Sequence, residues 1–154
     1  MNISKFKKWN NLIGFITFLI AFTTYSLTVE PTASYWDAAE YISTSAKLQV
    51  GHPPGAPFFQ MLGAFFASFA SNPDQIAFMV NMMSVFASAF TILFLFLTIT
   101  IIGKKIVLKN NSISNSNAII ILGSSLIGSL CFTFSDSFWF NAVEAEVYAM
   151  ATMI

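Results

Sequence analysis

The sequence predicts an all-α, polytopic membrane protein with about three transmembrane helices and further interfacial helices on the extracytoplasmic side. Of the 154 residues, 56% are hydrophobic and 9% are charged, whereas soluble domains carry about 25% charged residues. Three apolar segments, residues 12–29, 76–102 and 118–134, have about the length that a helix needs to cross a bilayer. Composition and segment length together indicate the membrane class.

The basic residues and the cysteine exclude two other classes. All seven basic residues are lysines, they occur in small clusters, and the net charge is zero, so no nucleic-acid partner is expected. Cys131 is the single cysteine of the sequence, so no disulfide can form inside the chain. It lies within an apolar run. We interpret it as a packing residue.

The first apolar segment follows a lysine cluster, so it fits either a secretory signal or a retained helix. Residues 12–29 are longer than a usual signal core, and no small-x-small cleavage site follows them. We therefore expect a retained transmembrane helix.

Two clusters of three lysines set the predicted topology, one before the first apolar segment and one after the second. Their members are Lys5, Lys7, Lys8, Lys104, Lys105 and Lys109. The positive-inside rule places both clusters, and with them the N-terminus, in the cytoplasm. An even number of crossings must then separate the clusters. Residues 30–75 are accordingly predicted to form one extracytoplasmic loop.

A fourth apolar segment, residues 56–70, lies within that loop and should not cross the membrane. At about 100° per residue its bulky side chains share one helix face and its small or polar ones share the other. The two sets are Phe58, Met61, Leu62, Phe65, Phe66 and Phe69, and Gln60, Gly63, Ala64, Ala67 and Ser71. This pattern fits a helix in the interface with its aromatics in lipid, or one packed against neighbouring spans.

The second hairpin and the end of the chain complete the topology. Residues 109–117 are short, polar and rich in Asn and Ser, which is typical of a cytoplasmic turn. Residues 135–154 then return to the extracytoplasmic side and begin a further loop and span. Because a new apolar run starts only at Val147, we expect the chain to be part of a larger membrane protein.

The extracytoplasmic loop opens with the segment Tyr-Trp-Asp-Ala-Ala-Glu-Tyr, residues 35–41. Ser34 followed by Asp37 fits a capping box, which predicts a helix over 34–48. One polar stripe of that helix holds Asp37, Glu40, Tyr41, Thr44 and Lys47, with Ala39, Ile42 and Ala46 opposite. In the simplest interpretation Asp37 is a capping carboxylate, and Glu40 and Lys47 are solvent-exposed.

The motif Gly-His-Pro-Pro-Gly, residues 51–55, follows this helix. Its two prolines end one helix and favour the start of the next. On its own, His52 is an ordinary interfacial histidine.

A second polar cluster lies on the same predicted side of the membrane. Its members are Asp136, Trp139, Asn141, Glu144, Glu146 and Tyr148. The two aromatic residues fit an interfacial belt. The two glutamates would face one way in an extended segment, as a chelating pair needs, but about 160° apart in a helix. Metal binding by both therefore requires non-helical backbone.

Three motifs in this order resemble the start of GT-C-type glycosyltransferases. They are Tyr-Trp-Asp-x-x-Glu-Tyr, Gly-His-Pro-Pro-Gly-x-Pro, and Phe-Trp-x-x-Ala-Val-x-x-Glu-Val-Tyr. The residues of these motifs are most similar to those of a bacterial membrane family related to animal transmembrane O-mannosyltransferases. The resemblance covers residues 29–150. It implies an enzyme that moves a sugar from a polyprenyl-phosphate donor to an acceptor hydroxyl on a protein or glycan.

The resemblance also implies roles for individual residues. Asp37 would be the catalytic acid of the first extracytoplasmic loop, acting as base or orienter on the acceptor hydroxyl, and Glu40 is the second candidate catalytic residue. Other residues of the resembling region would bind the substrate or a divalent metal. The substrate-binding residues would be His52, Lys47, Tyr41 and Trp139, and the metal ligands Glu144 and Glu146. The chain departs from O-mannosyltransferase relatives that carry adjacent Asp-Glu, because Ala38 follows Asp37 and the glutamate is Glu40; the superfamily that it resembles includes both metal-dependent and metal-free members.

Taken together, residues 1–154 are expected to be the N-terminal part of a multi-span GT-C-like domain in a bacterial inner membrane, inactive when isolated. Two alternatives remain open. A transporter or channel fragment would carry carboxylates within its spans, but here the acids lie at the ends of the spans. A small structural membrane protein would be complete at 154 residues.

Overall fold

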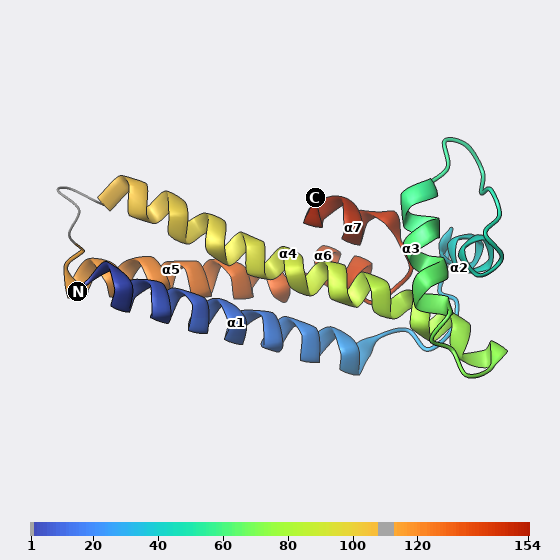
Figure 1. Ribbon diagram of the computed structural model, residues 1–154, viewed down its shortest axis with the longest axis horizontal. Helices are drawn as coiled ribbons and strands as arrows, with labels where there is room; N and C mark the ends of the chain where they lie inside the picture. Colours follow the sequence, from blue (N-terminus) through green and yellow to red (C-terminus); the bar gives the residue numbers. More distant parts are fainter. Residues whose placement is uncertain (1, 108–112) are drawn as a thin grey trace.

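The computed structural model describes residues 2–107 and 113–154, and every regular element in that part of the chain is helical. Three of the helices are long and apolar enough to cross a membrane. They are α1 (Ile3–Thr28), α4 (Ile76–Val107) and α5 (Asn115–Thr133), which run beside one another as a bundle (Figure 1). The predicted all-α membrane class and its three spans are confirmed.

Aromatic packing and one buried hydrogen bond hold the three long helices together. Phe22 of α1 and Phe86 of α4 pack with ring centroids 4.8 Å apart. The buried Tyr25 hydroxyl of α1 donates a 2.9 Å hydrogen bond to the carbonyl of Thr133, at the end of α5. In lipid the hydrophobic effect does not drive helices together, so close packing and interhelical hydrogen bonds of this kind maintain the bundle.

Five short helical segments lie in the connections; α2 and α3 lie at the end of α4 far from the N-terminus, whereas α6 and α7 lie beside the middle of α4 (Figure 1). They are α2 (Ala38–Lys47), α3 (Pro57–Ala67), the 3₁₀ turn η1 (Pro73–Gln75), α6 (Asp136–Ala142) and α7 (Val147–Met153). The start of a further span predicted within 135–154 therefore contains two short helices with a non-helical turn between them.

Helix α3 lies across the end of the bundle rather than along it (Figure 1). Its small face packs on α2, where any side chain at Gly63 would overlap Ser45. Three of its predicted bulky residues, Phe58, Met61 and Phe65, are exposed, as is Phe69 just beyond its end. Phe66 packs against Phe86 of α4. The bulky face is therefore mostly exposed and partly packed on α4, whereas Phe59 is buried with the small face; the contact of the exposed aromatics with lipid stays a prediction.

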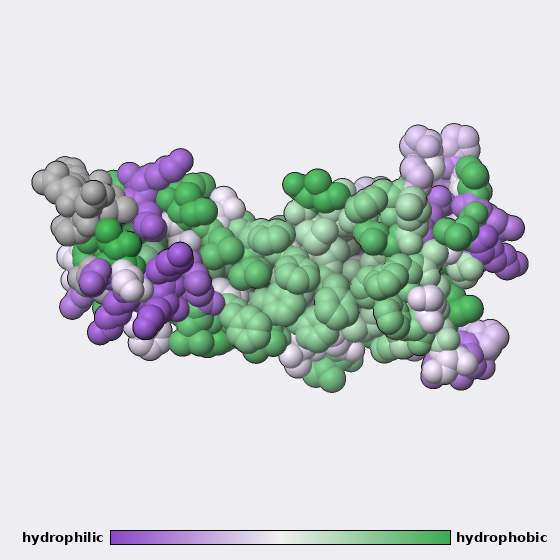
Figure 2. Space-filling view, viewed as in Figure 1, coloured by the Kyte–Doolittle hydropathy of each residue, from purple (hydrophilic) through white to green (hydrophobic). Residues whose placement is uncertain are grey.

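Charge is segregated between the two ends of the bundle, with hydrophobic side chains over the middle (Figure 2). All seven acidic residues of the sequence lie in the segments that follow α1 and α5, beyond the ends of those helices that are far from the N-terminus: Glu30, Asp37, Glu40, Asp74, Asp136, Glu144 and Glu146. Five lysines lie at the other end: Lys5, Lys7, Lys8, Lys104 and Lys105. Lys109 and the rest of residues 109–112 of the predicted polar turn 109–117 lie outside the described residues, and residues 115–117 form the first turn of α5. The two ends are called here the acidic end and the lysine end.

This arrangement brings the five described lysines of the two predicted clusters to one end, with the Lys104 ammonium 5.5 Å from the Phe6 ring centroid. The even number of crossings between the clusters agrees with that placement. None of the three long helices carries a carboxylate in its apolar middle, so the intramembrane acids that the transporter alternative needs are absent from the described spans.

The predicted start of the helix after residue 34 is wrong. Helix α2 begins at Ala38, because Trp36 has a positive φ of 62° that interrupts any helix running in from Ser34. Among the described residues the Ser34 hydroxyl has no hydrogen-bond partner, and Asp37 occupies the N-cap position without a side-chain capping bond. The capping box does not form, so the Asp37 carboxylate is not used as a cap.

The predicted polar stripe of this helix is also only partly exposed. Thr44 is buried beneath α3, where its hydroxyl accepts a 3.2 Å hydrogen bond from Gln60. Ala39 and Ala46, expected to pack inward, are exposed instead. The buried face of α2 is centred on Ile42 and Ser45, because that face meets the small surface of α3.

Candidate active site

The end of α2 returns the chain alongside its own start. Leu48 adopts the left-handed conformation, with φ 49° and ψ 47°, and the Gln49 N–H donates a 2.8 Å hydrogen bond to the Thr44 carbonyl. This closing pattern is typical of helix C-termini. It directs residues 49–55 back along α2 and so determines which side chains meet.

Two glycines shape this returning segment. Gly55 has φ +75°, a conformation that glycine adopts without strain, and its N–H donates to the His52 carbonyl at 2.8 Å. At Gly51 a Cβ atom would lie 3.0 Å from both a Glu40 oxygen and the Gln60 amide nitrogen. Gly51 therefore allows the backbone to approach Glu40 closely.

His52 binds Glu40 through two hydrogen bonds. Its backbone N–H donates to Oε1 at 2.6 Å, and its ring Nδ1 donates to Oε2 at 2.8 Å. The backbone bond, followed by the ring bond, lowers the pKa of Glu40. The hydrogen bond to Glu40 and the negative charge of Glu40 raise the pKa of His52. The pair therefore favours a carboxylate beside an imidazolium.

Asp37 lies on the other side of the imidazole. Its Oδ2 is 3.9 Å from His52 Nε2, the nitrogen that Glu40 leaves free. One ligand atom from each of the three residues lies within 4.8 Å of the others, and all three side chains are partly exposed. Two carboxylates and an imidazole at this spacing could bind a divalent cation or the polar groups of a substrate.

The two predicted polar clusters meet around Tyr41. Burial and the charges of Glu146, Asp37 and Glu40 raise the pKa of this phenol, and its ring packs on Phe59 with centroids 5.1 Å apart. Burial, followed by the charges of Glu144 and Asp37, raises the pKa of Glu146. Residues 37–52 and 144–146 therefore form one acidic site.

The glutamate pair has the non-helical backbone that shared metal binding requires. The residues between α6 and α7 form a bend, and Glu146 is extended, with φ −122° and ψ 143°. Glu144 and Glu146 are only 6% and 8% exposed. The backbone N–H of Val147 donates a hydrogen bond to the Glu146 carboxylate, and in the part of the chain that the structure describes neither glutamate forms an ion pair.

A groove of about 550 Å³ lies beside this site. It is called here the outer groove, and it is lined by Glu30, Ala33, Ser34, Tyr35, Phe140, Val143 and Glu144. Exposed aromatic rings and carboxylates therefore line one hollow. Such surfaces suit ligands that carry hydroxyl groups on an apolar frame, because rings cover the apolar face while carboxylates accept hydroxyl protons.

Comparison with known proteins agrees with the resemblance noted in the sequence. Residues 37–154 match the family described as protein O-mannosyl-transferase TMEM260 N-terminal domain. The chain belongs to this family. The matched region begins at Asp37 and includes all of the candidate site residues.

One relative extends the comparison. The chain is 29% identical over 139 residues to the protein O-mannosyl-transferase tmem260 of Dictyostelium discoideum. The alignment covers 90% of this chain but only 15% of that relative. No solved structure matches.

Two of the predicted substrate-binding residues lie apart from the Asp37–Glu40–His52 group. Lys47 is exposed in the last turn of α2 and, among the described residues, makes no ion pair. Ten residues of helix carry it about 15 Å from Asp37 along the axis. Trp139 packs against Tyr25, and its indole N–H donates a 3.0 Å hydrogen bond to Thr28. In this family member, Trp139 therefore connects α6 to the end of α1.

Sequence reasoning missed Asn81, which positions the acidic loop. This fully buried residue of α4 donates from its amide to the carbonyls of Glu30 and Thr32, at 2.7 and 2.9 Å. The Glu30 N–H donates in turn to the Val143 carbonyl at 2.9 Å. An amide within an otherwise apolar span was the available signal, because such a group needs internal partners.

Proposed function

We propose that the intact protein is a membrane glycosyltransferase that moves a sugar from a polyprenyl-phosphate donor to an acceptor hydroxyl on the extracytoplasmic side. Residues 1–154 would be the N-terminal part of its GT-C-like membrane domain. The name of the relative, a protein O-mannosyl-transferase, favours mannose as the sugar and a protein hydroxyl as the acceptor. The observation that carries the proposal is the approach of Asp37, Glu40 and His52 within the matched region.

Asp37 is the proposed general base. Its side chain is 55% exposed and, within residues 2–107 and 113–154, accepts no side-chain hydrogen bond. Its oxygens are therefore free to accept the proton of an acceptor hydroxyl as the new glycosidic bond forms. A positioned carboxylate of this kind contributes about 10²- to 10⁴-fold to a rate.

His52 is the proposed donor to the leaving phosphate. Glu40 accepts from Nδ1 and raises the pKa of the ring, which favours the imidazolium, the form in which Nε2 can donate a proton to a phosphate oxygen. The need for such a donor is strong, because seven acids lie at the acidic end and would repel an anionic donor. Positive groups aimed at developing charge are the usual solution. Glu40 would then position His52 rather than act on the acceptor, and Lys47 would contact a more distant part of the donor.

A divalent cation is the alternative source of positive charge. Asp37, Glu40 and His52 fit one by donor type and spacing, and the buried Glu144 and Glu146 offer two further carboxylates. When bound, the cation would neutralise charge on the leaving phosphate. The protein's own contribution would be to hold the carboxylates together despite their mutual repulsion.

The outer groove is the proposed acceptor site. Its carboxylates and rings, Glu144 and Tyr35 among them, lie beside the acidic site. Tyr41, between the two carboxylate pairs, would orient the sugar or the acceptor. Trp139 would support the groove through its contact with α1.

The proposed location is an integral-membrane one, with the lipid bilayer as a partner and no nucleic acid. The lysine end would face the cytoplasm by the positive-inside rule, which places the acidic end outside. A bacterial inner membrane stays a prediction from the resemblance, and the matched relative is from a eukaryote.

An assay of the intact protein in membranes tests the proposal. Polyprenyl-phosphate mannose with a radiolabelled sugar would be the donor, and Asp37→Asn would be compared with Asp74→Asn. Asp74 is an exposed acid in η1 at the same end of the molecule, so it controls for lost charge alone. We expect Asp37→Asn to reduce transfer by about 10²-fold or more and Asp74→Asn to leave it unchanged. Normal transfer by Asp37→Asn would remove Asp37 from the mechanism.

A further inference from the structure

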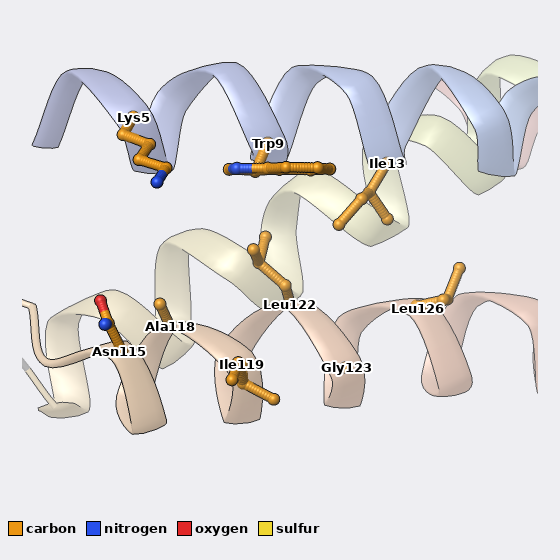
Figure 3. Close-up of a pocket in the computed structure, with 9 residues that line it drawn as sticks. All are labelled: Lys5, Trp9, Ile13, Asn115, Ala118, Ile119, Leu122, Gly123 and Leu126. Atoms are coloured by element: carbon orange, nitrogen blue, oxygen red, sulfur yellow. The ribbon is translucent and has the colours of Figure 1, made fainter. Parts of the chain in front are cut away.

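A second hollow lies at the lysine end, between α1 and α5. It has a volume of about 490 Å³ and is called here the α1–α5 groove. Figure 3 shows Lys5, Trp9 and Ile13 in a row along α1, facing residues of α5. The residues of α5 that line it are Asn115, Ala118, Ile119, Leu122, Gly123 and Leu126.

The groove has room for a hydrocarbon chain beside Gly123. A Cβ atom at that glycine would meet nothing within 4 Å, whereas Cβ atoms at Gly103 and Gly128 would meet side chains at 3.3 and 3.2 Å. Ile119 is 72% exposed. The inner part of the groove is therefore lined by apolar surface and is not filled by the described chain.

The mouth of the groove is basic and amphipathic. Lys5 lies at one end of the row, followed one turn later by Trp9, an order typical of the membrane–water interface. All seven acids of the sequence lie at the opposite end of the bundle, so no carboxylate here neutralises the ammonium group of Lys5. A negative headgroup above an apolar chain is the complementary ligand.

We propose that the α1–α5 groove binds an anionic phospholipid. Its phosphate would lie at Lys5 with the Asn115 amide nearby, and one acyl chain would run past Trp9 and Leu122 toward Gly123. This site is independent of sugar transfer, because it lies at the other end of the molecule from Asp37.

Photo-crosslinking in the intact protein tests which occupant fills the groove. A benzophenone side chain at Ile119, inside the groove, would be compared with one at Ile127, on α5 outside it and 66% exposed. The membranes would contain equal amounts of phosphatidylglycerol and phosphatidylcholine. We expect phosphatidylglycerol adducts at position 119 to exceed phosphatidylcholine adducts about fivefold, the factor that one lysine contributes near an anionic surface. Position 127 should show no preference. Crosslinks from 119 to another part of the protein would instead show that a helix fills the groove and would overturn the proposal.

Two substitutions separate the headgroup from the chain. Lys5→Gln should abolish the preference for phosphatidylglycerol, whereas Lys105→Gln should retain it, because Lys105 is at the same end but does not line the groove. Gly123→Leu should reduce adducts of both lipids at 119 by filling the apolar part. An unchanged preference in Lys5→Gln would overturn the proposal. Sugar transfer measured on the same variants distinguishes this result from a failure of the proposed function.

Discussion

His52 reaches both oxygens of Glu40, with its backbone N–H at 2.6 Å from Oε1 and its ring Nδ1 at 2.8 Å from Oε2. The Glu40 carboxylate thus fixes the position of the loop at His52 and favours the protonated form of its ring. The free nitrogen, Nε2, is directed toward Asp37 at 3.9 Å. Glu40 is therefore best understood as a positioning residue for His52.

Replacing Glu40 by Gln tests this relationship. Glu40→Gln should lower the pKa of His52 toward its ordinary value, because the charge and the hydrogen bond that raise it are lost or weakened. Transfer that needs protonated His52 falls as pH rises through this pKa, so the alkaline limb of the pH–rate profile should move to lower pH. We expect transfer at pH 7.5 to fall at least about tenfold. Asp136→Asn, an exposed acid at the same end, is the control, and a profile unshifted in Glu40→Gln would contradict the assigned role.

The contact between Glu40 and His52 could not be predicted from sequence. The motifs indicated that both residues lie in one loop, but their contact depends on the left-handed Leu48 and the turn at Gly55, which bring together residues 12 apart. Lys47 shows the opposite case. Sharing a helix stripe with Asp37 did not bring it close, because helical periodicity describes direction and not axial distance.

The spans were predictable because length and apolarity are local properties. The start of α2 was not, because Trp36 takes a positive φ that nothing in its own residue type favours. Equally, lysine placement could predict that the loop containing Asp37 and the one containing Glu146 are on one side. It could not predict that they are close enough for one charge to raise the pKa of the other.

Glu146 provides a prediction about stability. Its pKa is raised by burial and by neighbouring carboxylates, so the folded state favours the protonated acid. Ionising Glu146 therefore destabilises the folded state. This destabilisation is absent at low pH, where the acid is protonated in both the folded and the unfolded chain. It grows as pH rises above about 4.3, the ordinary pKa of Glu. Glu146→Gln should therefore unfold at a higher temperature than the wild type at pH 8 and at the same temperature at pH 4. Thermal unfolding in detergent, read by tryptophan fluorescence, measures this.

If Glu144 and Glu146 bind a divalent metal, adding the metal should make the wild type more stable than Glu146→Gln. Mn²⁺ at about 100 times its Kd would stabilise the wild type by about 2.7 kcal/mol, and EDTA would remove the effect. Glu146→Gln should then show little stabilisation by Mn²⁺. If Mn²⁺ stabilised the wild type and Glu146→Gln equally, these glutamates would not be ligands.

Gly51 tests whether the site needs close backbone approach. Gly51→Ala would place a methyl group 3.0 Å from Glu40 and Gln60, so Glu40 must shift away from His52. We expect transfer to fall about tenfold or more, since a small misplacement of a positioned group is costly, with little change in thermal unfolding. Gly123→Ala, where the new Cβ meets nothing within 4 Å, is the matched control. Full transfer by Gly51→Ala would mean that the Glu40–His52 contact is not needed.

Asn81 links the membrane bundle to the acidic site, because its amide holds the carbonyls of Glu30 and Thr32. Asn81→Ala would leave both carbonyls without that donor in a buried setting, at a cost of about 1–3 kcal/mol. The loop leading to Asp37 would then be released, so transfer should fall together with the unfolding temperature. Ser84→Ala is the control, because Ser84 is buried one turn further along α4 and its hydroxyl has no hydrogen-bond partner in the part of the chain that the structure describes. If Asn81→Ala and Ser84→Ala changed transfer and the unfolding temperature equally, Asn81 would have no special role in positioning the loop.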